Sequence, residues 1–217
     1  MPDFKNPENQ LSPESLITFT IASTLLAIAP GPDNIFVMTQ SALFGRKSGI
    51  FITLGLCTGL LVHTSAVALG IAALFLVSKT AFTVLKMIGT CYLLYLAWNA
   101  FHAKAHKVDG STVNMPGPGA LYRRGVIMNL SNPKIAIFFL AFLPQFANPE
   151  AGNITGQLFL LGIIFLTISL IVFIFIASLA GLISQWLKHS EEAQVLLNRI
   201  AGFVFITLAL RLATASR

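Results

Sequence analysis

The chain has 217 residues, of which 55% are hydrophobic and only 10% are charged, and its formal net charge is +6. A soluble domain has about 25% charged residues, so this composition excludes an ordinary soluble protein. Apolar stretches of about 18 residues or more recur along the chain and indicate an integral membrane protein. The basic residues lie in the short connections between these stretches, which is typical of topology control and contact with the lipid bilayer. No basic run is interleaved with aromatic residues, so nucleic-acid binding is not expected.

Six membrane-spanning segments are predicted after a short polar arm over residues 1–15. In chain order they cover residues 16–43, 49–77, 82–101, 125–146, 157–182 and 196–213. A tight basic loop over 45–48 follows the first segment, and a polar, basic linker over 102–124 is the longest connection. This linker separates two halves of three segments each, 16–101 and 125–213, within a single membrane domain covering residues 1–217.

The first segment contains a break, in which Ala29 is followed by Pro30, Gly31, Pro32 and Asp33. Each proline removes a backbone amide donor and its ring clashes with the carbonyl group four residues earlier, so a continuous helix here would be costly. Irregular backbone at membrane depth is tolerated only where protein or water satisfies its polar groups. Because an ionisable side chain follows the break at once, Asp33 is the first candidate for a functional residue.

A second break lies in the fourth segment at Asn132 and Pro133, directly followed by Lys134. When Pro32 is aligned with Pro133, Asp33 takes the position of Lys134. Since each half has three segments, the second half crosses the membrane in the opposite sense. The predicted fold is therefore an all-α integral membrane protein with six transmembrane helices, arranged as an inverted 3+3 repeat whose broken helices 1 and 4 mark the binding site.

The two charges lie at a similar depth. Asp33 is 13 residues before Arg46, and Lys134 is 10 residues after Arg124. At about 1.5 Å per residue, both lie roughly 15–20 Å from the segment ends marked by Arg46 and Arg124, near the middle of the membrane. An unpaired charge there costs at least about 2.5–3.5 kcal/mol, so we expect Asp33 and Lys134 to be partners. A static pair that only staples two proline-kinked helices is the alternative interpretation.

The distribution of basic residues predicts the orientation. Five basic residues lie on the side of the termini, namely Lys5, Lys79, Lys86, Arg211 and Arg217. Eight lie in or beside the connections after the first, third and fifth segments, namely Arg46, Lys47, Lys104, Lys107, Arg123, Arg124, Lys188 and Arg199. Since basic loops stay in the cytoplasm, both termini are predicted to lie outside it, on the periplasmic or extracellular side.

Two motifs in these segments are specific: Ala29-Pro30-Gly31-Pro32-Asp33, and Gly125-x-x-x-Asn129-Leu130-x-Asn132-Pro133-Lys134. They resemble the LysE/RhtB family of amino-acid exporters. Weaker patterns, such as Gly55-x-x-x-Gly59-x-x-x-His63, extend the resemblance over nearly the whole chain. The resemblance implies a six-helix secondary transporter of the inner membrane that exports amino acids or small derivatives such as homoserine and is driven by the proton gradient.

The chemistry of a zwitterion suggests how these residues would act. Lys134, with helix ends exposed by the break at Pro133, would hold the substrate carboxylate. Asp33 would hold the ammonium group or carry the coupling proton, and the two charges would pair when no substrate is bound. Asn34, Asn129 and Asn132 would add neutral hydrogen bonds. His63 would either relay protons or only bond a neighbouring carbonyl group.

Two other classes of protein are less compatible with the sequence. An intramembrane enzyme would need a nucleophile–base pair or metal ligands, and the motifs HExxH and GxSxG do not occur. Cys57 and Cys91 lie inside apolar segments without CxxC spacing, so packing is their predicted role, and no metal or other cofactor is expected. A passive channel for small zwitterions is the second alternative, but unlike charges in an inverted repeat favour a carrier. Association with a second copy of the chain is left open.

Overall fold

The computed structural model describes residues 11–77, 79–102, 116–189 and 191–214, and this part of the chain is helical apart from short turns. Eight α-helices and three short η helices follow one another in it. They are α1 (Pro13–Ile28), α2 (Pro32–Phe44), α3 (Arg46–Val77), α4 (Lys79–His102), α5 (Pro118–Leu130), α6 (Pro133–Ile137), the π-helix η2 (Phe138–Phe142), the 3-10 helices η3 (Leu143–Phe146) and η4 (Pro149–Ala151), α7 (Ile154–His189) and α8 (Glu191–Thr214).

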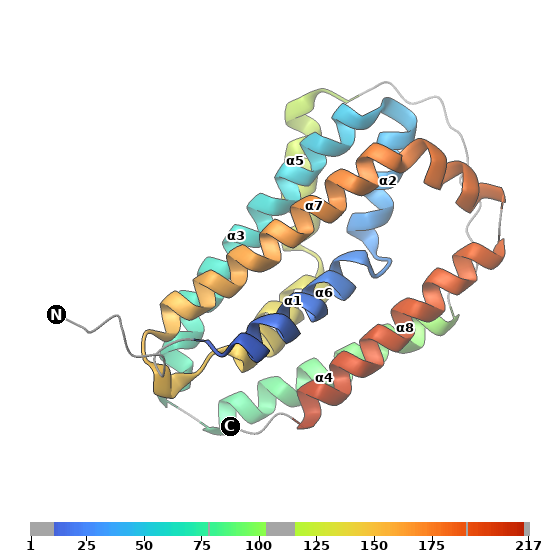
Figure 1. The fold of residues 1–217 in the computed structure, drawn as a ribbon. Helices are drawn as coiled ribbons and strands as arrows, with labels where there is room; N and C mark the ends of the chain where they lie inside the picture. Colours follow the sequence, from blue (N-terminus) through green and yellow to red (C-terminus); the bar gives the residue numbers. More distant parts are fainter. Residues whose placement is uncertain (1–10, 78, 103–115, 190, 215–217) are drawn as a thin grey trace.

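The helices form two groups with the broken elements between them (Figure 1). Helices α3, α5 and α7 pack side by side, and α2 lies against α7 and α3. Helices α4 and α8 form a separate pair, and α1 and α6 lie between this pair and the long helices. Corresponding helices of the two halves of the chain therefore pack on each other, α3 on α7 and α4 on α8.

Length and composition identify up to four membrane spans in the described residues. Helix α3 over residues 46–70 and helix α7 over residues 154–180 are each long and apolar enough to cross a bilayer. The pair α1–α2 and the pair formed by α5 with residues 133–146 each add one span if a bent pair is counted as a single crossing. The predicted integral membrane protein is thus confirmed in class, and four of the six expected spans are supported on these criteria.

Both predicted breaks are present, and each is followed by a helix that begins at a proline. Helix α1 stops at Ile28 and α2 begins at Pro32, and the two axes differ by 54°. Helix α5 stops at Leu130 and the next helix begins at Pro133, with a bend of 49°. In each case the proline stands at the first helical position, where its missing amide donor costs nothing because that amide has no partner within the helix.

Three expected boundaries differ from the structure. The fourth segment begins at Pro118 and not at residue 125, because Gly117 and Pro118 provide an N-terminal start upstream of the arginines. The expected basic loop is reduced to Gly45, whose positive φ of 85° ends α2, and α3 starts at Arg46. Helix α7 continues to His189, beyond the predicted end at residue 182.

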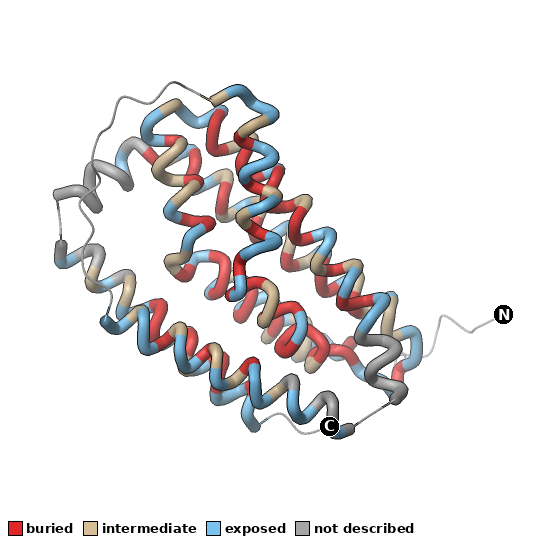
Figure 2. The backbone as a smooth tube through the Cα atoms, turned by 180° about the vertical axis from the view of Figure 1, so that it is seen from behind, coloured by how far each residue is buried: buried red, intermediate tan, exposed pale blue. Residues whose placement is uncertain are grey.

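The interior is concentrated on the inward faces of the helices and around the breaks, as Figure 2 shows. Glycines allow α3 and α5 to approach closely there. A Cβ atom on Gly55 would collide with the Tyr122 carbonyl oxygen, and one on Gly125 would collide with the Ile52 carbonyl oxygen. The backbones of the two helices therefore touch, which is the packing that small residues permit between membrane helices.

Candidate functional site

The two breaks bring polar residues from both halves of the chain into one buried cluster. The charged members, Asp33 and Lys134, are 1% and 5% exposed. Each stands at the second position of a helix that starts after a break, α2 for Asp33 and α6 for Lys134. Three buried asparagines complete the cluster: Asn34, Asn129 and Asn132.

Side chains of this cluster satisfy the carbonyl groups at the end of α1. The Lys134 ammonium group donates hydrogen bonds to the carbonyl oxygens of Ala29 at 3.2 Å and Leu26 at 3.4 Å. The Asn34 amide donates to the Ala27 carbonyl oxygen at 2.7 Å. The last carbonyl groups of a helix have no partner within it and carry the negative end of the helix dipole, so a cation is well placed there. Lys134 thus compensates the break in the other half of the chain.

Gly31 leaves the space that Lys134 occupies. A Cβ atom on Gly31 would lie 2.9 Å from the Lys134 Nζ atom, so any larger residue would displace the ammonium group. Among the described residues, Lys134 and Asp33 do not form a direct ion pair, although their charges interact through space. The expected direct pairing is therefore replaced by an arrangement in which each charge contacts other groups.

Asp33 is linked to α3 through Asn129. The Asn129 amide donates a hydrogen bond to Asp33 Oδ2 at 3.4 Å, and the Asn129 carbonyl oxygen lies 3.4 Å from His63 Nε2. The Asn129 side chain lies directly against Gly59, where a Cβ atom would come within 2.6 Å of its Oδ1 atom. The pattern Gly59-x-x-x-His63 on α3 therefore positions the residue that holds Asp33.

Several polar atoms of the cluster have no hydrogen-bond partner in the described chain. They are Asp33 Oδ1, Asn34 Oδ1, Asn129 Oδ1 and Asn132 Nδ2. A buried polar atom without a partner costs about 1–3 kcal/mol, so four of them at one place are unfavourable for a purely structural cluster. Three acceptors, one of them a carboxylate oxygen, and one amide donor suit a small ligand with an ammonium group.

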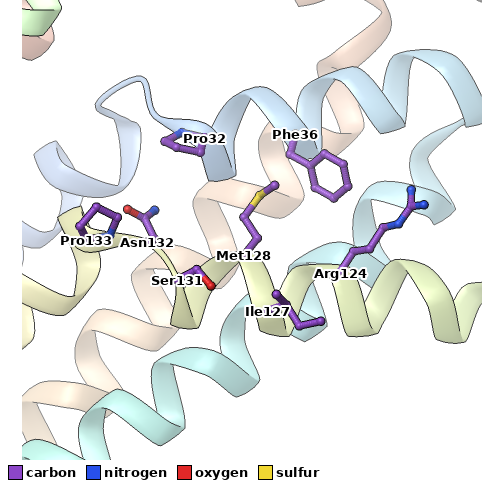
Figure 3. Close-up of a pocket in the computed structure, with 8 residues that line it drawn as sticks. All are labelled: Pro32, Phe36, Arg124, Ile127, Met128, Ser131, Asn132 and Pro133. Carbon is purple, nitrogen blue, oxygen red and sulfur yellow. The ribbon is translucent and has the colours of Figure 1, made fainter.

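A pocket of about 550 Å³ reaches this cluster from one side (Figure 3). Pro32, Asn132 and Pro133 lie at its inner end, at the two breaks, and Arg124 lies at the opposite end. Its remaining lining is contributed by Phe36, Ile127, Met128 and Ser131. We call this pocket between α2 and α5 the crevice.

Phenylalanines fill the space on the other side of the breaks. They come from α1, from η2 and η3 and from α7: Phe19, Phe138, Phe139, Phe142, Phe146 and Phe165. Ring centroids are 4.9 Å apart for Phe138 and Phe165, and 5.1 Å apart for Phe19 and Phe146. We call these six residues the aromatic cluster. Its rings are almost completely buried.

The sequence identified the residues at the breaks but not the two regions beside them. The structure brings together all ten candidates: Pro30 and Gly31 form the non-helical break, Pro32 begins α2, and His63 approaches from α3. In the sequence, Arg124 indicates only the topology, and Gly59 is only part of a weak family pattern. Only the spacing of Gly59 and His63 on one face of a helix hinted at a link to the site.

Fold and site together define an all-helical membrane protein with an internal polar site at two paired helix breaks. The chain belongs to the LysE type translocator family, whose model matches residues 24–216. This confirms the resemblance found in the motifs, and the family is one of translocators and not of enzymes.

Relatives cover almost the full length of the chain. A homoserine/homoserine lactone efflux protein of Salmonella typhimurium is 33% identical over 198 residues, which is 91% of this chain and 95% of that protein. An uncharacterized membrane protein of Vibrio cholerae is 30% identical over 92% of this chain and 96% of its own length. The membrane protein YrhP of Bacillus subtilis is 29% identical, with coverage of 91% and 97%. No solved structure matches the chain.

Proposed function

We propose that this protein is a secondary transporter of the inner membrane that exports small amino acids or their derivatives in exchange for protons. Homoserine and homoserine lactone are the first candidate substrates, because a relative of nearly equal length is named for their efflux. The observation that carries the proposal is the buried cluster of Asp33 and Lys134, with its unpartnered polar atoms, at the inner end of the crevice.

The unpartnered atoms suggest how an amino acid binds. Asp33 Oδ1 and the amide oxygens of Asn34 and Asn129 accept hydrogen bonds from the substrate ammonium group. The carboxylate binds the third N–H of Lys134 and the first amides of α2, which has no side-chain cap. Each of these contacts supplies a partner for a polar group that would otherwise be buried without one, so they favour binding at this depth.

The arrangement of the helices supports an alternating carrier built as an inverted 3+3 repeat. We assign α4 and α8 as the remaining two of six spans, because each has 24 residues and is long enough to cross a bilayer of about 30 Å. The two bends of 54° and 49° occur at corresponding places of the two halves. A rocking movement that closes the crevice and separates the aromatic cluster would then expose the same site to the opposite side.

Asp33 is the group that exchanges the substrate for a proton. Its carboxylate is held by one amide of Asn129 and sits close to Lys134, so protonation would release a bound ammonium group by removing its counter-charge. With both termini on the periplasmic side, the crevice opens to the cytoplasm. A proton entering from outside would thus expel the substrate outward and reset the carrier.

Transport by purified protein in proteoliposomes tests the proposal. We expect uptake of homoserine that saturates with concentration, increases with an imposed pH gradient and is abolished by Asp33→Asn. Because asparagine has nearly the same shape as aspartate, this variant removes the negative charge and is expected to keep the fold. A flux that rises linearly with substrate concentration and ignores the pH gradient would instead identify a passive channel, and full gradient-driven export by Asp33→Asn would refute the role of this carboxylate.

A further inference from the structure

The crevice contains a second polar feature that lies apart from the cluster at the breaks. Arg124, in the middle of α5, is the one charged residue that lines it. Its side chain lies at the end of the crevice away from Pro32 and Pro133, as Figure 3 shows. Its guanidinium group forms no hydrogen bond or ion pair with another side chain of the described residues.

The walls next to Arg124 make an anion the favoured ligand. Phe36, Ile127 and Met128 present apolar surface, so nothing beside the guanidinium group competes for its N–H donors or repels an anion. A guanidinium group binds a carboxylate through two parallel hydrogen bonds, which fixes the orientation of the ligand as well as attracting it. The neighbouring Arg123 is equally exposed but does not line the crevice.

The distance along α5 makes Arg124 a separate binding position. Arg124 precedes Asn132 by eight positions, which corresponds to about 12 Å at the rise of an α-helix. The Arg124 guanidinium group points away from Asn132 in Figure 3, and an extended amino acid spans only about 3.3–3.6 Å along its backbone, so we expect one small substrate to contact only one of the two positions at a time. A molecule that enters the crevice therefore meets Arg124 first and the cluster afterwards.

We propose that Arg124 is an access site for carboxylates, at which substrates are captured before they move to Asp33 and Lys134. This inference rests on the proposed function. Its consequence is specificity: a substrate with a free carboxylate, such as homoserine, gains from Arg124, whereas homoserine lactone, in which the carboxylate is closed into a ring ester, does not. The anion that Arg124 binds is the substrate and not the phosphate of a lipid headgroup, because the groove leads directly to the polar cluster.

The test compares Arg124→Gln with Arg123→Gln, which removes the same charge from the same turn of α5 but not from the crevice. We expect Arg124→Gln to raise KM for homoserine about five- to tenfold with little change in kcat, the loss of one charge-assisted contact at an exposed position. KM for homoserine lactone stays unchanged, Arg124→Lys recovers part of the loss, and Arg123→Gln behaves as wild type with both substrates.

Three results would overturn the access site. Equal effects of Arg124→Gln on both substrates would show a general structural or lipid-binding role, and the lipid role is identified if the effect disappears in liposomes without anionic lipids. Equal effects of the two glutamine variants would show that only net charge matters. An unchanged KM for homoserine would exclude the site directly.

The proposed function and the access site fail in distinguishable ways. If wild-type protein does not transport homoserine, or if Asp33→Asn transports it fully, the proposed function fails. Equilibrium binding of homoserine and its lactone to the detergent-solubilised proteins then still tests Arg124, since the variant should weaken binding of homoserine alone. Equal affinities of Arg124→Gln and wild type for homoserine in that measurement would exclude the access site.

Discussion

The two sides of the buried cluster are built in opposite ways. Toward α2 and α5, the two half-helices leave a crevice of about 550 Å³ between them that ends at Arg124. Toward α1 and α6, the aromatic cluster fills the corresponding space with packed rings. The same pair of breaks thus borders an open pocket on one side and a closely packed interior on the other.

The composition of the two sides explains the difference. Helices α2 and α5 are regular α-helices; α2 begins at the first break and α5 ends at the second. After Pro133 the chain instead runs through a π-helix over Phe138–Phe142 and then a 3-10 helix over Leu143–Phe146. Phe138 and Phe142 stand four residues apart on one face of this helix, and both are buried. Irregular helix of this kind is also the easiest to rearrange when the closed side opens.

The largest effect is expected from Lys134→Met, which removes the element common to both sides. The carbonyl groups of Leu26 and Ala29 then lose their charged donor, and Asp33 loses its neighbouring positive charge. We expect transport to fall about 100-fold and the free energy of unfolding in detergent to fall by about 3 kcal/mol. The double variant Asp33→Asn with Lys134→Met should regain part of the stability but none of the transport. Wild-type stability of the single variant would contradict the capping role.

A second prediction compares a phenylalanine of each side. Phe138 is 1% exposed inside the aromatic cluster, whereas Phe36 lines the crevice and is only partly buried. Phe138→Ala leaves a cavity and is expected to lower the free energy of unfolding by about 3 kcal/mol, and Phe36→Ala by about 1 kcal/mol. Because the closed side is weakened, Phe138→Ala should also leak homoserine in the absence of a pH gradient. Equal leaks in the two variants would show that the aromatic cluster is not the closed side.

The breaks and their charges were predictable from the sequence, because proline acts on its own helix. Pro32 and Pro133 each remove a donor at a known position, and the charge that follows needs a partner wherever the helix lies. The sequence could not show that Lys134 caps α1, because this contact depends on how α6 packs beside a helix more than 100 residues earlier in the chain.

The aromatic cluster was not predictable for a similar reason. Its rings come from α1, from the irregular turns after α6 and from α7, and single phenylalanines in an apolar segment look alike whether they face lipid or the interior. The π-helix over Phe138–Phe142 also has no sequence signal. In contrast, the early start of α5 had one, in Gly117 and Pro118, whose significance was obscured by the basic residues that follow.

A smaller effect is expected from Gly59→Ala, which touches the site only through Asn129. The added methyl group would collide with the Asn129 side chain and weaken its hydrogen bond to Asp33. We expect transport to fall about tenfold, the equivalent of one hydrogen bond to a charged group. Gly70→Ala on the same helix is the matched control, since nothing lies within 4 Å of its added Cβ atom. If both variants transport alike, Gly59 serves only the packing of α3 and α5.

The smallest effect on transport, but the most direct view of the two sides, is expected from single cysteines. After replacement of the free residues Cys57 and Cys91 by alanine, Met128→Cys places a thiol in the crevice and Phe142→Cys places one in the aromatic cluster. A membrane-impermeant thiol reagent applied to the side of Arg124 should modify Met128→Cys rapidly, because its thiol reaches water, and should leave Phe142→Cys unmodified. Homoserine should slow the first reaction, since it occupies the same crevice. A proton gradient that is acidic on the side opposite to Arg124 is then applied. If it makes Phe142→Cys reactive from that side while protecting Met128→Cys, the two sides open in alternation. Simultaneous reactivity of both positions would instead indicate a continuous pore.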